Sequence, residues 1–130
     1  MQRADLDWGN LGFGVTETDF TIVCRWRQGG WSKPEVRSKW TLELPIAASA
    51  LHYGQSVFEG MKAFETVDGR VALFRPDQNA RRMHRGAQKL LMAPVPEEMF
   101  VEVVEQCIRI NRRFVPPSDS GAALYVRPLL

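Results

Sequence analysis

The densest group of residues that could bind an anion lies between positions 81 and 89. Arg81, Arg82 and Arg85 are followed by Lys89, one helical turn further on. On a helical wheel all four lie away from the apolar stripe of the same segment. An arginine can bind a phosphate or a carboxylate through two parallel hydrogen bonds. The pattern therefore fits either an anion site or a solvated face, and periodicity does not choose among the three arginines.

Two other segments carry groups suited to a polar ligand in an apolar pocket. Residues 51–60 (LHYGQSVFEG) contain Tyr53, whose hydroxyl is carried on an aromatic stem. A core tyrosine with a satisfied hydroxyl fits that segment equally well. Near the end of the chain, Tyr125 and Arg127 occupy alternate positions of an expected strand and should share one face. Arg127 lies in a segment that reads as buried, so it needs either an internal carboxylate or an anionic substrate as partner.

No catalytic nucleophile can be identified. The lysines lie among charges or turn residues, not in an apolar stretch that would lower the pKa of an amine. Cys24 and Cys107 are far apart and no CxxC pair occurs. With only two histidines beside them, neither a metal site nor a disulfide framework is indicated. The chain thus offers binding groups without a group that performs chemistry.

The elements that must position these groups are strands, then two helices, then a strand. Alternation over 20–27 followed by Gln28-Gly29-Gly30, and the pair of apolar runs around Asp68-Gly69, predict two hairpins. Apolar spacing predicts one helix that opens at Pro76-Asp77 and another that follows Pro96. Residues 122–126 predict a further strand. This order predicts an α+β domain.

Length and composition predict a single domain over 1–130. The chain has 130 residues, 45% hydrophobic and 25% charged, with a net charge of +2. That charge is too small to indicate a nucleic-acid or membrane partner. No apolar run approaches the roughly 18 residues of a membrane span, and the first ten residues lack a signal-peptide core, so we expect a cytoplasmic protein. The apolar end at Leu129-Leu130 is typical of a chain that has been cut.

Three motifs resemble the branched-chain amino acid aminotransferases, which are pyridoxal-phosphate enzymes of fold type IV. The motifs are LHYGQSVFEGMKAF (51–64), VALFRPDQNARRMHRGAQKL (71–90) and LYVRP (124–128). They stand in the family's order with near-family spacing, and the likeness covers nearly the whole chain. The resemblance implies the family's small N-terminal domain, an antiparallel-rich twisted sheet with two consecutive helices packed on it.

The resemblance also implies roles for particular residues. The family's phosphate-binding arginine falls on Arg82, within Asn79-Ala80-Arg81-Arg82-Met83. Arg127 would pair with the side-chain carboxylate of glutamate as amino donor. The remaining substrate-pocket residues would be Phe13, Tyr53, Phe58 and Tyr125, and Tyr53 is expected to reach the neighbouring subunit's site in a homodimer.

The family's catalytic centre is not expected in this chain. Its Schiff-base lysine, the tyrosine beside that lysine and the glutamate facing the pyridine nitrogen belong to the large C-terminal domain, which would begin just past Leu130. We therefore expect the isolated chain to be inactive, although the complete enzyme would move an amino group from leucine, isoleucine or valine to 2-oxoglutarate.

Two alternatives remain. One is another fold-type-IV enzyme of the D-amino acid transaminase or aminodeoxychorismate lyase type, although LHYGQSVFEG and LYVRP favour the branched-chain group. The other is a non-catalytic module that binds a phosphorylated ligand or nucleic acid through residues 81–89. Because basic and aromatic residues do not interleave there as in single-strand binders, we do not expect nucleic acid as a partner. The small net charge and the lack of a long apolar run likewise predict no membrane partner.

Overall fold

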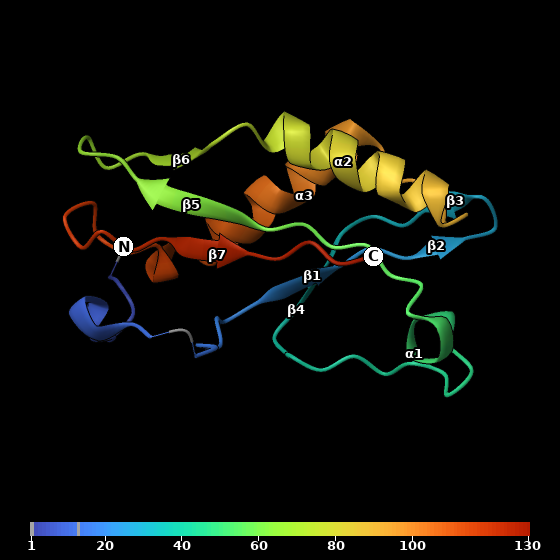
Figure 1. Cartoon of the computed structure of the whole chain (residues 1–130). Helices are drawn as coiled ribbons and strands as arrows, with labels where there is room; N and C mark the ends of the chain where they lie inside the picture. Colours follow the sequence, from blue (N-terminus) through green and yellow to red (C-terminus); the bar gives the residue numbers. More distant parts are fainter. Residues whose placement is uncertain (1, 13) are drawn as a thin grey trace.

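A three-stranded antiparallel sheet organises the chain, which a computed structural model describes over residues 2–12 and 14–130 (Figure 1). Its central strand is β5 (Met61–Glu65), with β6 (Val71–Leu73) on one side and β7 (Leu124–Val126) on the other. Ala63 lies opposite Leu73 on one edge and opposite Leu124 on the other. A bridge between Phe58 and Leu129 continues the β5–β7 pairing beyond the strands.

Alternation along these strands separates a covered face from an open one. Met61 and Ala63 are buried, and Leu124 and Val126 pack against the same core. The other face, which we call the open face, is solvent-exposed. Its residues are Phe58, Gly60, Lys62, Phe64, Ala72, Tyr125, Arg127 and Leu129.

Two helices pack on the covered face of the central sheet. Helix α2 (Pro76–Lys89) begins with proline in its first turn, and α3 (Glu97–Ile110) begins with two glutamates, both of which favour a helix start. Ala80 and Met83 from α2 join Phe100, Val104 and Ile108 from α3 in one core cluster with the sheet. A 3₁₀ turn, η2 (Arg112–Phe114), follows α3. No helix in the described part of the chain has an apolar stretch long enough to cross a bilayer.

The first half of the chain forms two smaller sheets. Strand β1 (Thr21–Val23) pairs with β4 (Glu35–Arg37), and β2 (Trp26–Arg27) pairs with β3 (Gly30–Trp31). The hairpin predicted at Gln28-Gly29 is confirmed, because both residues have positive φ and place Trp26 opposite Trp31. The run expected over 20–27 is divided between two sheets. The α+β class is therefore confirmed, with its strands distributed over three small sheets.

Two short helices precede the central sheet and were not predicted. They are η1 (Trp8–Asn10) and α1 (Ser49–Tyr53), and α1 ends at Gly54 in the left-handed region. Figure 1 shows α1 standing off the body formed by α2, α3 and the central sheet. Residues 40–44, whose apolar side chains alternate, form no strand, and Leu42 and Leu44 are exposed. Alternation without a paired neighbour therefore did not produce a strand.

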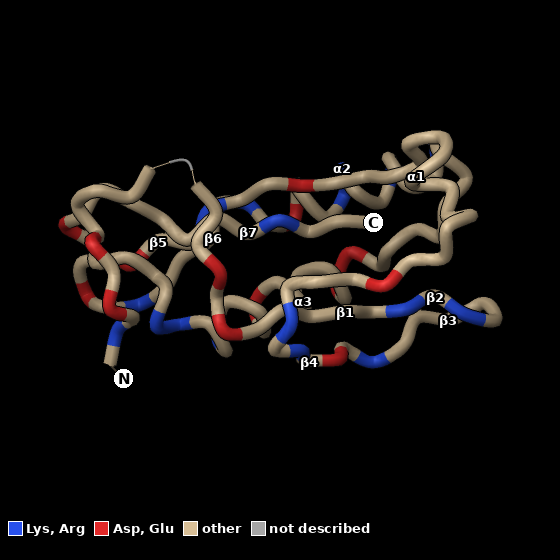
Figure 2. The backbone as a smooth tube through the Cα atoms, turned by 90° about the horizontal axis from the view of Figure 1, so that it is seen from below, with Lys and Arg blue, Asp and Glu red and all other residues tan. Residues whose placement is uncertain are grey.

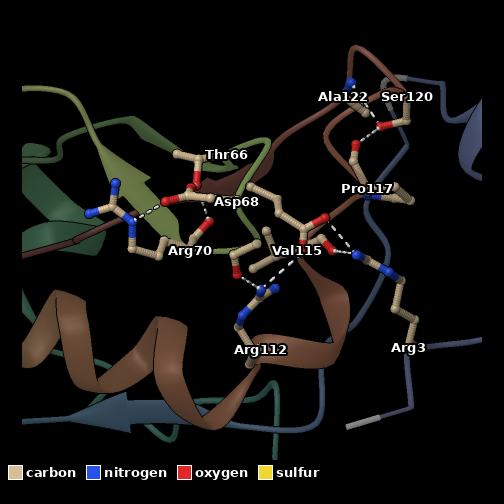
Figure 3. Close-up of polar contacts among 11 residues, drawn as sticks. Arg3, Thr66, Asp68, Arg70, Arg112, Val115, Pro117, Ser120 and Ala122 are labelled. Atoms are coloured by element: carbon tan, nitrogen blue, oxygen red, sulfur yellow. Dashed lines mark hydrogen bonds and ion pairs between the residues drawn. The ribbon is translucent and has the colours of Figure 1, made fainter.

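Ion pairs fasten the N-terminal segment to the far end of the central sheet (Figure 3). Glu65, the last residue of β5, accepts from Arg3 at 2.6 Å and from Arg112 at 2.9 Å. Arg3 also donates to the Val115 carbonyl at 3.0 Å. Hydrogen bonds from Arg112 and Arg3 hold the pKa of Glu65 below its usual range. The N-terminus, the β5 end and the segment after α3 thus meet at one carboxylate.

The buried side-chain amide of Asn111 joins the end of α3 to the residue before β1, and this contact predicts an effect on stability. Asn111 is 2% exposed, accepts from the Phe20 amide at 3.0 Å and donates to the Phe20 carbonyl at 2.9 Å. We expect Asn111→Ala to lower the free energy of unfolding by about 1–3 kcal/mol, because both Phe20 groups lose their partner. Urea unfolding measures this. Asn10→Ala, at an exposed position, should change it by less than about 0.5 kcal/mol; equal effects would contradict the role of Asn111.

Candidate functional site

A buried carboxylate lies at the entry to β5. The Glu59 side chain is 4% exposed, and helix α2 supplies its partners. Arg82 binds it with two hydrogen bonds, Nε to Oε1 and Nη2 to Oε2, both at 2.6 Å. Asn79, one turn earlier on α2, donates to Oε2 at 2.8 Å and to the Gly60 carbonyl at 3.3 Å. Glu59, Asn79 and Arg82, which we call the carboxylate clamp, thus join the strand to the helix.

The clamp keeps both charges in place. Burial alone would raise the pKa of Glu59, but hydrogen bonds from Arg82 and Asn79 outweigh it and leave the pKa below its usual range. The bond to Glu59 raises the pKa of Arg82 in turn. Glu59 is therefore an anion, and Arg82 a cation, throughout the neutral range.

The clamp leaves Arg82 able to bind a second anion. A guanidinium has five N–H donors, of which Glu59 takes two, and the Arg82 side chain is 62% exposed. Arg81 pairs with Glu97 at 3.3 Å on the surface, with both partners about half exposed. Arg85 and Lys89 have no ion-pair partner in the described part of the chain. Of the three candidate arginines, Arg82 is thus the one whose orientation a buried partner fixes, which fits the binding of a phosphate group.

A second group of site residues lies on the open face. The Arg127 guanidinium carbon lies 4.4 Å from the Phe58 ring centroid and 5.2 Å from that of Tyr125. Arg127 Nη2 donates to the Tyr125 hydroxyl at 2.7 Å. The shared face predicted for Tyr125 and Arg127 is confirmed. The expectation that Arg127 is buried is wrong, because its side chain is exposed. The guanidinium packs against the Phe58 and Tyr125 rings instead of pairing with a carboxylate.

One glycine permits this arrangement. A Cβ at Gly60 would lie 2.3 Å from the Tyr125 hydroxyl oxygen, so the tyrosine packs directly over backbone. The carboxylate clamp and the open-face residues are also adjacent in the chain. Phe58 points to the open face and Glu59 to the helices. The Glu59 amide donates to the Pro128 carbonyl, next to Arg127, at 2.9 Å.

The other two predicted pocket residues are not brought into this group. Tyr53 is 86% exposed on α1, and its ring centroid lies 6.2 Å from that of His52. Phe13 lies outside the described residues. Two hollows open on the described surface, one of about 560 Å³ bordered by the β2–β3 hairpin and one of about 380 Å³ bordered by Val71 and Arg112. Neither of these two hollows is lined by Arg82, Tyr53 or Arg127.

Sequence reasoning missed two members of the clamp, Glu59 and Asn79. The sequence did mark Glu59, because it is the one acidic residue between Val57 and Phe64, where Lys62 is the other charged residue. The sequence offers little indication of a role for Asn79, because a single buried amide on a helix has no recognisable pattern. Figure 2 shows Lys and Arg along the β2–β3 hairpin and β4, where Trp26 and Trp31 also pack with ring centroids 5.5 Å apart. No group of three metal-ligating side chains occurs among the described residues.

Comparison with known proteins agrees with the resemblance. No family model matches the chain. It is 44% identical over 126 residues to the branched-chain-amino-acid aminotransferase of Haemophilus influenzae, an alignment that covers 97% of this chain and 37% of the relative. It is 45% identical over 130 residues to mitochondrial branched-chain-amino-acid aminotransferase 1 of Arabidopsis thaliana, covering 99% of this chain and 34% of the relative. The chain thus spans about a third of the length of these relatives.

Solved structures show the same likeness in three dimensions. The T.th. branched-chain amino acid aminotransferase with pyridoxamine 5'-phosphate superposes with a TM-score of 0.62 at 28% identity, over 87% of this chain and 32% of that one. The complex of the T.th. enzyme with N-(5'-phosphopyridoxyl)-L-glutamate gives a TM-score of 0.59 at 32% identity, over 72% of this chain and 29% of that one.

Sequence and fold therefore make this chain a homologue of the aminotransferases. More particularly, it is related to the branched-chain amino acid aminotransferases and corresponds to their N-terminal domain.

The packing of Tyr125 on Gly60 gives a prediction for the open face. Gly60→Ala should displace the Tyr125 hydroxyl and break its bonds to Arg127, since a Cβ cannot lie 2.3 Å from that oxygen. Because both side chains are exposed, stability should change little. Arg127 Nε also donates to the Tyr125 hydroxyl, at 3.1 Å, so a shift of the Nε–H signal in ¹⁵N NMR reports the loss. Gly30→Ala, where a Cβ meets nothing within 4 Å, should leave that signal in place; an unmoved signal in Gly60→Ala would contradict the packing.

The clamp also predicts that the free energy of unfolding falls at acid pH. Because the pKa of Glu59 is lowered in the folded state, its contribution is complete above the ordinary glutamate pKa of about 4.3 and is lost as pH falls through the lowered native value. Glu59→Gln should therefore flatten the fall in the free energy of unfolding below that pH, measured by urea titration at a series of pH values. Glu97→Gln, which removes an exposed carboxylate, should follow the wild-type curve. A wild-type slope in Glu59→Gln would show that the clamp carboxylate does not titrate as described.

Proposed function

We propose that this chain is the small N-terminal domain of a pyridoxal-phosphate-dependent branched-chain amino acid aminotransferase. In this proposal Arg82 binds the cofactor phosphate, and Phe58, Tyr125 and Arg127 border the substrate. The observation that carries it is the fixed orientation of Arg82, which keeps three N–H donors free while a buried carboxylate holds the other two. A phosphate dianion is a suitable partner for donors presented in this way.

The open-face residues match the two kinds of side chain that such an enzyme must accept. The rings of Phe58 and Tyr125 offer apolar surface to leucine-like side chains. Arg127, held between them, offers a cation to the side-chain carboxylate of glutamate. The cofactor, when bound, supplies the electron sink for transamination. This chain's own part is to bind the phosphate and orient and select the substrate.

The remaining parts of the enzyme lie outside this chain in our proposal. Residues 1–130 form one domain, and a separate C-terminal domain supplies the Schiff-base lysine, so the chain alone does not transaminate. We propose that the complete enzyme is a cytoplasmic homodimer that uses 2-oxoglutarate as amino acceptor. Tyr53, exposed on α1, then reaches the neighbouring subunit's site, and Phe13 completes the aromatic wall. The coverage of the relatives supports the separate C-terminal domain, since the chain spans 37% and 34% of the length of the two described above.

The geometry favours this proposal over the non-catalytic module. Such a module would use the cations of residues 81–89 alike, whereas Glu59 fixes the orientation of Arg82 alone and Arg81 is paired with Glu97 on the surface. Other fold-type-IV enzymes remain an alternative for the substrate. Oligonucleotide binding that weakens steeply with salt would favour the module instead.

Binding of pyridoxal phosphate tests the role of Arg82. We expect Arg82→Gln to weaken binding of pyridoxal phosphate by about tenfold or more, because a charge-assisted bidentate contact is lost. Arg85→Gln, also an exposed arginine of α2, removes the same charge and should change binding little. Equilibrium dialysis with inorganic phosphate as competitor measures both. Equal losses in the two variants would mean that only the general charge of α2 attracts the ligand.

Mixtures of this chain with pyridoxal phosphate also test the proposal that the Schiff-base lysine lies outside it. After borohydride reduction, mass spectrometry should find no lysine of this chain carrying the phosphopyridoxyl group specifically, and mixing with leucine and 2-oxoglutarate should yield no glutamate. Stoichiometric labelling of one lysine would contradict the proposal that the Schiff-base lysine lies elsewhere.

A further inference from the structure

We infer that Glu59 is a positioning residue for the phosphate site, one that orients Arg82 without touching the ligand. The inference rests on the proposed function of Arg82. It assigns a role to a carboxylate that lies outside the basic helix and was not among the candidate site residues.

The first reason is the cost of burying this carboxylate. Glu59 is 4% exposed, and a buried anion is tolerated only when it is paired and hydrogen-bonded. Both oxygens are occupied, Oε1 by Arg82 and Oε2 by Arg82 and Asn79. Removing the carboxylate would therefore leave Asn79 and Arg82 without the group toward which they converge.

The second reason is geometric. A long, 62% exposed arginine side chain ordinarily samples many rotamers, and ordering it at the moment of binding costs affinity. Nε and Nη2 form the edge of the guanidinium that grips Glu59, so the plane of the group is fixed. The Nη1 donors and the second Nη2 donor then point in a constant direction. Asn79 strengthens this by tying the same carboxylate oxygen and the Gly60 carbonyl together.

The third reason is the place of Glu59 in the chain. It lies between Phe58, which contacts Arg127 on the open face, and Gly60, over which Tyr125 packs. Its amide donates to the Pro128 carbonyl. The carboxylate therefore sets the position of Arg82 relative to the strand that carries the proposed substrate residues.

Two opposite effects on phosphate binding make the inference testable. If Glu59 only competed with phosphate for Arg82, or acted only through its negative charge, Glu59→Gln would strengthen phosphate binding, since a like charge is removed. If Glu59 positions Arg82, the same variant weakens binding although the site becomes more positive. The sign of the change thus separates positioning from competition.

The first measurement needs neither variant nor ligand. In ¹⁵N NMR of the wild-type chain, the Arg82 Nε–H should exchange with water about tenfold more slowly than the Arg85 Nε–H, as a hydrogen bond to a buried charge requires. Similar exchange for the two side chains would overturn the inference at once, whether or not Glu59→Gln folds.

The second measurement is the affinity for pyridoxal phosphate and for inorganic phosphate. We expect Glu59→Gln to weaken both by roughly tenfold, the scale found when outer partners that orient metal ligands are removed. Glu97→Gln is the matched control, because it removes one carboxylate paired with the neighbouring arginine, Arg81, on the exposed surface. That variant should bind phosphate as the wild type does or slightly more tightly. Unchanged or tighter binding by Glu59→Gln would overturn the inference.

Arg82→Gln separates this inference from the proposed function. If Arg82→Gln loses phosphate binding and Glu59→Gln does not, Arg82 is the phosphate ligand and the positioning role alone is wrong. If Arg82→Gln binds phosphate as tightly as the wild type, the proposed function of Arg82 fails, and the positioning role for phosphate fails with it.

Discussion

A carboxylate withdrawn from water dictates the arrangement of this chain around β5. Glu59 cannot remain charged in its buried place unless donors from another element reach it, and α2 supplies all of its side-chain partners. The helix must therefore lie with Asn79 and Arg82 facing the entry to β5. The orientation of the proposed phosphate ligand and the seating of the helix on the sheet are consequences of this one requirement.

The open face shows the complementary constraint. Strand alternation directs Met61 and Ala63 toward the helices and leaves Phe58, Phe64 and Tyr125 toward solvent. Several large apolar side chains on one sheet face are unusual on a free surface and typical of a surface that another group covers. In our proposal the substrate and the remainder of the enzyme provide that cover, with Arg127 as the cation among the rings.

Local rules explain which elements could be predicted. The β5–β6 and β2–β3 hairpins follow from Asp68-Gly69 and Gln28-Gly29, whose turns accept positive φ. Helices α2 and α3 follow from apolar spacing and charged ends. Partner choice was not predictable in this way. The pairing of β1 with β4, the division of 20–27 between two sheets and the absence of a strand at 40–44 depend on which segments meet, and alternation contains no such information.

By itself, the sequence determined the class of the fold, the family resemblance and the set of candidate side chains, because these depend on residue types and short-range spacing. Only the tertiary structure distinguished Arg82 from Arg81 and Arg85 by its contacts, since that distinction comes from a glutamate 23 residues away in the chain. It also brought Phe58 to Arg127 and left Tyr53 apart. A helical wheel places a side chain on a face, but the partner opposite that face is decided by packing.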